Sequence, residues 1–155
     1  MRKIFKSQKE TKDFAKSFAR KFSISRKQRG ALVLALVGNL GAGKTTFVQG
    51  FLRELGVRSK ITSPTFVLIK RYRLKCSLLH DLCFMNAYHI DAYRIKKPKE
   101  LLDLGIKEIL KNPENIVLIE WADRIKKILP GNPVWIKFEH GDKENERLIE
   151  VTNFK

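Results

Sequence analysis

Apolar positions follow two different patterns along this chain. Near the N-terminus, Phe14, Phe18 and Phe22 recur at four-residue intervals, which places them on one face of a helix. Ser7 and Glu10 precede them with the spacing of a capping box, so the helix is expected to begin there. The run "ALVLALV", residues 31–37, is instead apolar at every position and predicts a strand buried on both faces of a sheet.

The rest of the chain alternates between the two patterns. Such alternation predicts an α/β fold whose sheet is mostly parallel, and a terminal hairpin around "GDKENE" adds antiparallel edge strands. The expected helices are 44–55, 98–110 and 122–129, and the expected strands, besides 31–37, are 66–72, 115–121, 134–140 and 147–154.

Composition narrows the class of protein. The chain has 155 residues and is 43% hydrophobic, which predicts a single domain over residues 1–155 with its own core. Its longest apolar run is far too short to span a bilayer, and the N-terminus lacks the apolar centre of a secretory signal. Cys76 and Cys83 do not form a disulfide or zinc pattern. We therefore expect a cytoplasmic protein without membrane contact.

Positive charge is concentrated at the start of the chain. The formal net charge is +16, and residues 1–29 carry eleven Lys and Arg against Glu10 and Asp13. A polyanionic partner such as tRNA, or an acidic protein face, would explain this surplus. A solvated basic face and a generally basic proteome remain alternatives.

The stretch "GNLGAGKTT" after the first buried strand carries the strongest chemical signal. Gly38, four further residues and then Gly43, Lys44 and Thr45 match the phosphate loop of nucleotide-binding proteins. Glycines let successive backbone N–H groups converge on phosphate oxygens, and the helix N-terminus adds its dipole. Lys44 would reach the β and γ phosphates, and the Thr45 hydroxyl would bind Mg²⁺. The motif predicts a P-loop NTPase-like three-layer sandwich that binds a nucleoside triphosphate.

Acidic and hydroxyl side chains elsewhere are candidates for the same site. Glu120 ends a buried strand, where a carboxylate could hold Mg²⁺, although it could also be an ordinary strand-end residue. In "YHIDAYR", Asp91 could orient water or pair structurally with Arg94, and alternation places His89, Asp91 and Tyr93 on one face. "TSPTF", residues 62–66, could sense the γ-phosphate or be a plain turn.

Taken together, "GNLGAGKTT", "TSPTF", "YHIDAYR" and "IEWADR" resemble the bacterial TsaE (YjeE) family over nearly the whole chain. The resemblance implies a small cytoplasmic ATPase with weak activity alone. It also implies that the protein works with the TsaB and TsaD subunits, and reaches tRNA through that complex, in making threonylcarbamoyladenosine. Transfer of the threonylcarbamoyl group would belong to TsaD.

The resemblance also implies roles for individual residues. Thr45 and Glu120 would bind Mg²⁺, and Lys44, Asp91 and Glu120 would be catalytic. Thr11 would approach the nucleotide base, and Trp121 would contact a partner or simply pack. The phosphate cradle would consist of Gly41, Ala42, Gly43, Lys44, Thr45 and Thr46, and the switch-like loop of Thr62, Ser63, Pro64 and Thr65.

The sequence departs from the family pattern at two points, and three other functions are alternatives to the one that the resemblance implies. Asn39 stands where the family usually has Asp, and the segment 73–87 is longer than the family's usual connection.

A small-molecule kinase would share the phosphate loop but needs an acceptor pocket and usually a lid. A GTPase is disfavoured because no Asn-Lys-x-Asp segment occurs. An RNA-binding module without catalysis would leave the phosphate loop unexplained.

Overall fold

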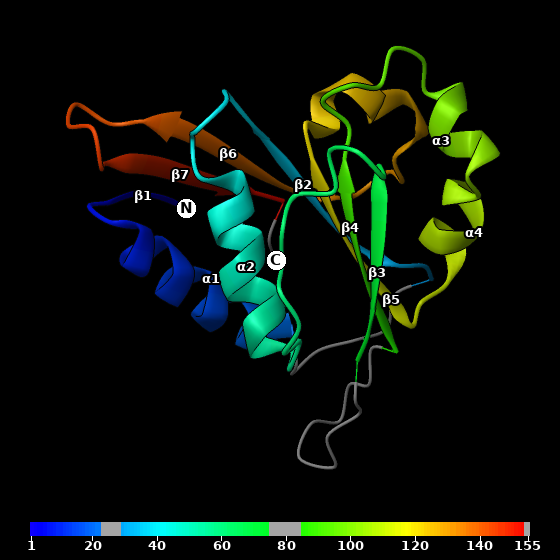
Figure 1. Cartoon of the computed structure of the whole chain (residues 1–155), viewed down its shortest axis with the longest axis horizontal. Coiled ribbons are helices and arrows are strands. Elements are labelled where there is room, and N and C mark those ends of the chain that lie inside the picture. Colours follow the sequence, from blue (N-terminus) through cyan, green and yellow to red (C-terminus); the bar gives the residue numbers. More distant parts are fainter. Residues whose placement is uncertain (23–28, 75–84, 154–155) are drawn as a thin grey trace.

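The computed structural model describes residues 1–22, 29–74 and 85–153 as a seven-stranded sheet with helices on both faces (Figure 1). In chain order the elements are β1 (Arg2–Phe5), α1 (Gln8–Phe22), β2 (Leu32–Gly38), α2 (Lys44–Glu54), β3 (Ile69–Arg73), β4 (Asn86–Asp91), α3 (Lys99–Asp103), α4 (Ile106–Lys111), β5 (Asn115–Glu120), the 3₁₀ helix η1 (Ala122–Ile128), β6 (Val134–His140) and β7 (Arg147–Thr152).

The sheet is parallel in its centre and antiparallel at both edges, in the order β1-β7-β6-β2-β5-β4-β3. Strand β2 pairs in parallel with β5 and β6, and β4 pairs in parallel with β5. The antiparallel pairs β1–β7, β6–β7 and β3–β4 complete the two sides. The predicted parallel sheet with antiparallel edge strands is therefore confirmed.

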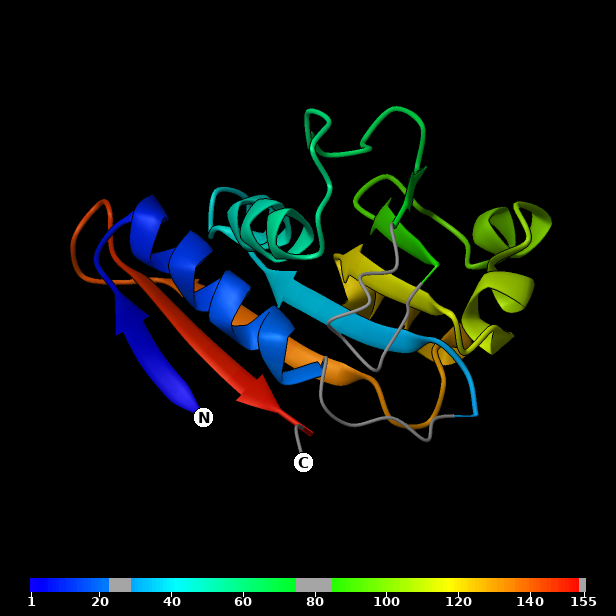
Figure 2. The ribbon, with the colours of Figure 1, turned by 90° about the horizontal axis from the view of Figure 1, so that it is seen from below.

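Three layers result from this arrangement (Figure 2). On one face of the sheet, α1 and α2 bury an apolar core that includes Leu34, Phe47 and Phe138. On the other face, α3, α4 and η1 cover a second core that includes Val33 and Ile119. Because β2 and β5 lie between two cores, residues 32–36 and 116–119 are apolar on both faces of the sheet, which explains the unbroken apolar runs.

Helix α1 forms as its sequence predicts. The Ser7 Oγ atom accepts a hydrogen bond from the Glu10 N–H (3.1 Å), and the Glu10 carboxylate accepts one from the Lys6 N–H (2.8 Å). Phe14 and Phe18 then meet Phe47 of α2, with ring centroids 5.9 and 6.0 Å apart. This burial of aromatic side chains anchors α1 onto α2.

Three predicted segments differ from the structure. The strand expected over 66–72 begins only at Ile69, because Leu68 has a φ of 61° and its N–H bonds to the Pro64 carbonyl (2.7 Å). The helix expected over 98–110 is two short helices, because Gly105 adopts a left-handed φ of 79°. The segment 122–129 folds as the 3₁₀ helix η1.

The sequence patterns did not predict β1, which pairs with β7. Most of the long connection 73–87, with Cys76 and Cys83, lies outside the described residues, so the predictions for it are not tested. In the three described ranges, no helix combines the length and apolar character that crossing a membrane requires.

Candidate functional site

The glycine-rich loop lies between the C-terminal end of β2 and the start of α2. Gly38 has a φ of 143°, and a Cβ atom there would lie only 2.2 Å from the Phe138 carbonyl oxygen. Gly43 has a φ of 101° directly before Lys44 begins the helix. Both positions favour glycine, since other residues rarely adopt this conformation.

Residues of the terminal hairpin support the loop from the other side. The His140 Nε2 atom lies 3.2 Å from the Leu40 carbonyl oxygen, and the Arg147 Nε–H donates to the Gly41 carbonyl (3.1 Å). The two contacts span 100 and 106 residues of sequence, and neither residue was predicted from sequence to belong to the site. The hairpin therefore helps to hold the loop carbonyls in place, turned away from the N–H groups that would face an anion.

The Lys44 ammonium is folded back onto its own loop. Its Nζ donates to the carbonyls of Gly38 (2.6 Å) and Asn39 (2.8 Å) and lies 4.0 Å from the ring centroid of Trp121. Burial lowers the pKa of Lys44, while the charges of Glu120, Asp91 and Asp123 oppose that shift. The ammonium thus contacts groups that carry no net charge, and phosphate oxygens could take the place of these groups as its partners.

Trp121 holds this lysine through a locally uncommon backbone. Its φ of 59° is left-handed, and its ring also packs against Tyr93 with centroids 5.0 Å apart. A positive φ at a bulky residue persists only where the surroundings enforce it, and such strain is often found at functional sites. The side chain therefore packs against the core, one of the two roles expected from sequence, and it also contacts the Lys44 ammonium, while partner contact stays a prediction.

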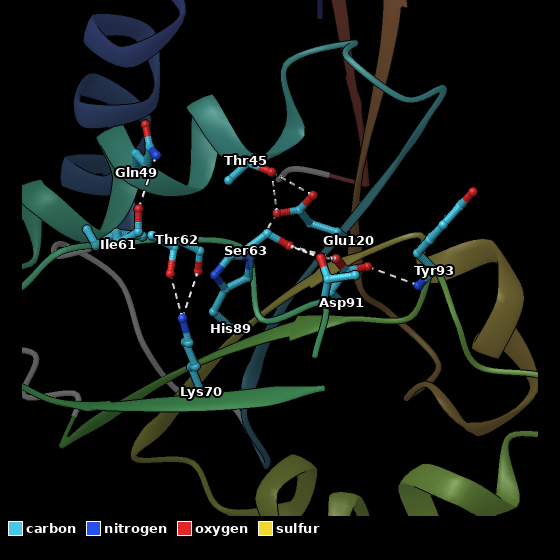
Figure 3. Close-up of polar contacts among 11 residues, drawn as sticks. Thr45, Gln49, Ile61, Thr62, Ser63, Lys70, His89, Asp91, Tyr93 and Glu120 are labelled. Carbon is cyan, nitrogen blue, oxygen red and sulfur yellow. Dashed lines mark hydrogen bonds and ion pairs between the residues drawn. The ribbon is translucent and has the colours of Figure 1, made fainter. Parts of the chain in front are cut away.

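A chain of polar contacts connects half-buried Thr45 of α2 with buried side chains of β5 and β4 (Figure 3). The Thr45 Oγ1 atom lies 2.9 and 3.0 Å from the two carboxylate oxygens of Glu120, and His89 Nε2 lies 2.8 Å from Glu120 Oε1. His89 is fully buried, and its Nδ1 atom has no hydrogen-bond partner among the described residues. We infer that Nε2 carries the proton donated to Glu120, since a protonated Nδ1 would leave a buried N–H unpaired.

Asp91 organises the neighbouring loop. Its Oδ2 atom accepts from the Ser63 Oγ (2.7 Å) and the Thr65 Oγ1 (2.8 Å), and its Oδ1 atom accepts from the Tyr93 N–H (2.9 Å). These bonds replace the alternative pair with Arg94, whose guanidinium lies over the Phe66 ring, 4.8 Å from its centroid. Asp91 therefore links β4 to the predicted switch-like loop.

The structure corrects one detail of the sequence prediction for these segments and adds one to it. Strand β4 ends at Asp91, so His89 and Asp91 share a face but Tyr93 lies beyond the strand and is 43% exposed. In the switch-like loop, the Thr62 hydroxyl accepts from Lys70 Nζ (2.6 Å), while Pro64 is buried. Thr62 and Pro64 thus fix the base of the loop, and Ser63 and Thr65 face the site.

These side chains surround one cavity of about 400 Å³. The sequence did not predict Gln8 and Leu40 as part of its wall. Thr11 does not line it; this residue is 1% exposed, and its hydroxyl donates to the Ser7 carbonyl (3.3 Å). The lining residues are Gln8, Leu40, Gly41, Ala42, Gly43, Lys44, Thr45, Thr46, Ser63, Thr65, Asp91, Tyr93, Glu120 and Trp121.

The donors in this cavity fit Mg²⁺ shared with a phosphate ligand. Among the described residues, no group of three or more His, Cys, Asp and Glu side chains could hold a metal. Mg²⁺ commonly takes only one or two protein oxygens, and completes its shell with water and substrate phosphates. Adjacent ligands of an octahedral Mg²⁺ lie about 2.9 Å apart, and the Thr45 hydroxyl lies 2.9 Å from Glu120 Oε1.

The sheet order, the loop before α2 and the polar cavity together define the class of P-loop nucleotide-binding folds. The sequence model of one family, "Threonylcarbamoyl adenosine biosynthesis protein TsaE", matches residues 5–149. The chain belongs to the TsaE family.

Individual relatives agree with this assignment. The chain is 34% identical over 151 residues to the tRNA threonylcarbamoyladenosine biosynthesis protein TsaE of Rickettsia bellii, covering 97% of this chain and 93% of that protein. It is 40% identical over 115 residues to the Bacillus subtilis protein of the same name, covering 74% and 66% of the two chains.

Among solved structures, the fold matches the crystal structure titled "Bacillus subtilus YdiB" with a TM-score of 0.72 and 30% identity. The match covers 97% of this chain and 83% of that one. The expected family and fold class are confirmed, and these names favour a role in tRNA modification over the small-molecule kinase.

Proposed function

We propose that this protein is a single-domain, Mg²⁺-dependent ATPase that supports threonylcarbamoyladenosine modification of tRNA. The observation that carries the proposal is the contact of Thr45 with Glu120 beside the phosphate loop, at 2.9 and 3.0 Å. This contact joins two hard oxygen donors from distant parts of the chain in the wall of a cavity that Lys44 also lines. Mg²⁺, when bound, would supply neutralisation of charge on the β and γ phosphates.

Residues 41–46 would hold the triphosphate. The backbone N–H groups at the start of α2 would bind its oxygens, and the helix dipole would favour its negative charge. Lys44 would leave the Gly38 and Asn39 carbonyls and turn its ammonium to the phosphates. His89 would hold Glu120 in place through the 2.8 Å contact, so that the carboxylate and the Thr45 hydroxyl remain together.

Asp91 would support hydrolysis from the strand beside Glu120, where the two residues are register partners. It lines the cavity and accepts three hydrogen bonds that fix its orientation. A carboxylate held in this way could orient a water molecule and accept its proton. The hydroxyls of Ser63 and Thr65 would couple the loop to the same carboxylate, which gives the loop a means of sensing the γ-phosphate.

The protein would act with partner subunits in the cytoplasm. The names of its relatives place those proteins in tRNA threonylcarbamoyladenosine biosynthesis. From the family resemblance we propose TsaB and TsaD as the partners, with tRNA reached through their complex. Adenine contacts would be made near Gln8, which lines the cavity one helical turn before Thr11.

The decisive experiment measures ATP turnover for the protein alone and then with TsaB, TsaD and tRNA. We expect weak turnover alone and faster turnover in the full assembly, with both dependent on Mg²⁺. Each measurement includes a screen for phosphate transfer to small-molecule acceptors. Transfer to an added acceptor, without stimulation by the subunits, would refute the proposal in favour of the kinase.

A further inference from the structure

Positive charge is unevenly distributed over the chain. Of the net charge of +16, residues 1–29 contribute nine, and residues 53–73 contribute five because six Lys and Arg stand against Glu54 alone. The remaining 105 residues contribute only two. A generally basic proteome would be expected to spread its charge over the whole surface, so this segregation indicates a localised polyanion-binding face.

The fold brings the two basic segments together. Helices α1 and α2 lie side by side on one face of the sheet (Figure 2), and a Cβ atom at Gly50 would come within 2.5 Å of the Lys12 carbonyl. The Arg20 Nε lies 2.6 Å from the Glu54 carboxylate, so the one acidic side chain of the second segment is paired. The positive charges of the residues that follow the C-terminal end of α2 are therefore not compensated by an acidic side chain of the same segment.

A groove of about 530 Å³ opens at that end of the helix. The salt bridges among the described residues involve none of Arg58, Lys60 and Arg73, and all three side chains are exposed. Half-buried Tyr72 packs against the core at the groove. The groove is lined by Gly56, Val57, Arg58, Ser59, Arg71, Tyr72 and Arg73.

This groove is separate from the nucleotide cavity. The two share no lining residue, and they lie at opposite ends of α2, which has 11 residues. A helix of that length spans about 16 Å. An anion bound in the groove would therefore not compete for the contacts of Lys44 and Thr45.

We propose that the groove and the basic side of α1 beside it bind the phosphodiester backbone of RNA. Arginine predominates here, and its planar guanidinium suits phosphate oxygens because it can donate two parallel hydrogen bonds. A run of phosphates along the groove and α1 matches an extended strip of positive charge better than a single small anion does. The inference rests on the proposed function for its substrate class: it gives this protein a direct contact with tRNA.

The test compares two charge-reversal variants of the full chain. The groove variant is Arg58→Glu and Arg73→Glu, which line the groove, together with Lys60→Glu, which is exposed and follows the lining residue Ser59 in sequence. The control is Lys107→Glu, Lys111→Glu and Lys127→Glu, which reverses three exposed lysines on or near α4 and η1, across the sheet. Both variants lower the net charge equally, so only the position differs. Binding of a fluorescent, unmodified tRNA transcript is measured by anisotropy over a range of NaCl concentrations, without nucleotide.

We expect the groove variant to bind at least tenfold more weakly and the control to bind within about threefold of the wild type. The salt slope should fall by roughly 2 to 3 in the groove variant, since each lost phosphate contact removes about 0.7–0.9. Unchanged melting temperature and ATP affinity in both variants would show that they are folded.

Three results would overturn the proposal. The wild type could fail to bind the transcript, both variants could lose affinity equally, or the groove variant could keep its affinity and slope. If that variant instead failed only to associate with TsaB and TsaD, the groove would bind an acidic protein face and not RNA. Since RNA binding is measured without ATP, the RNA affinities can be interpreted even if the ATPase proposal fails. The ATP turnover can likewise be interpreted if the protein does not bind RNA.

Discussion

Replacing Asp91 by asparagine separates the chemical role of the carboxylate from its role in fixing the loop. In the wild type, one oxygen accepts from Ser63 and Thr65 and the other from the Tyr93 N–H. An asparagine has only one acceptor oxygen. If that oxygen faces the two hydroxyls, the amide NH₂ faces the Tyr93 N–H, and a donor is left without an acceptor.

The expected loss in the free energy of unfolding follows from these three hydrogen bonds. A hydrogen bond to a charged group contributes about 1.5–3 kcal/mol, and one between neutral groups about 0.5–1.5 kcal/mol. Losing one bond and weakening two others should therefore lower the free energy of unfolding by about 2–4 kcal/mol. For a chain of this size, such a loss should lower the melting temperature by roughly 5–15 °C.

The assay combines urea denaturation, ATP affinity and ATP turnover with TsaB, TsaD and tRNA. The matched control, Ser63→Ala with Thr65→Val, removes both hydroxyl donors and leaves the carboxylate in place. We expect Asp91→Asn to keep ATP affinity but to lower turnover about 100-fold, in the range for loss of a positioned general base. The control should lose less turnover than Asp91→Asn.

Two results would refute this reasoning. If Asp91→Asn melted within a degree of the wild type, the three hydrogen bonds would not have the energetic role assigned to them. If it and the control lowered turnover by the same factor, Asp91 would act only by organising the loop, and the general-base role would be wrong.

Three further predictions concern the phosphate loop and its neighbour Glu120. Lys44→Ala should lower ATP affinity at least tenfold in calorimetric titration with an unchanged circular dichroism spectrum, and unchanged affinity would remove Lys44 from the site. Thr45→Val and Glu120→Gln should each weaken ATP binding in Mg²⁺ more than in EDTA, whereas an equal effect in both would show that these residues do not hold the metal. Because burial lowers the pKa of Lys44, ATP affinity should fall as the pH rises through a range below that of an ordinary lysine. Stability of the free protein should rise over the same range, since the unfolded state binds the lysine proton more tightly, and Lys44→Arg should abolish both trends.

Local patterns in the sequence determined several parts of this protein. The capping box and phenylalanine spacing predicted α1, the unbroken apolar run predicted β2, and the loop glycines predicted the turn into α2. Each of these features depends on residues close together in the chain, so its physical cause can be read without the fold. The phosphate loop belongs with them, because its chemistry is contained in a short contiguous stretch.

Only the tertiary structure decided how distant residues meet. Thr45 and Glu120 are 75 positions apart, and their contact requires β5 to pair in parallel with β2. Likewise, no local sequence pattern indicated that Arg147 supports the loop or that the Trp121 backbone is left-handed. Thr11 was expected near the nucleotide, but the packing of α1 buries it and turns Gln8 to the cavity instead. Strand pairing and helix packing depend on burial summed over the whole sheet, which no short window of sequence contains.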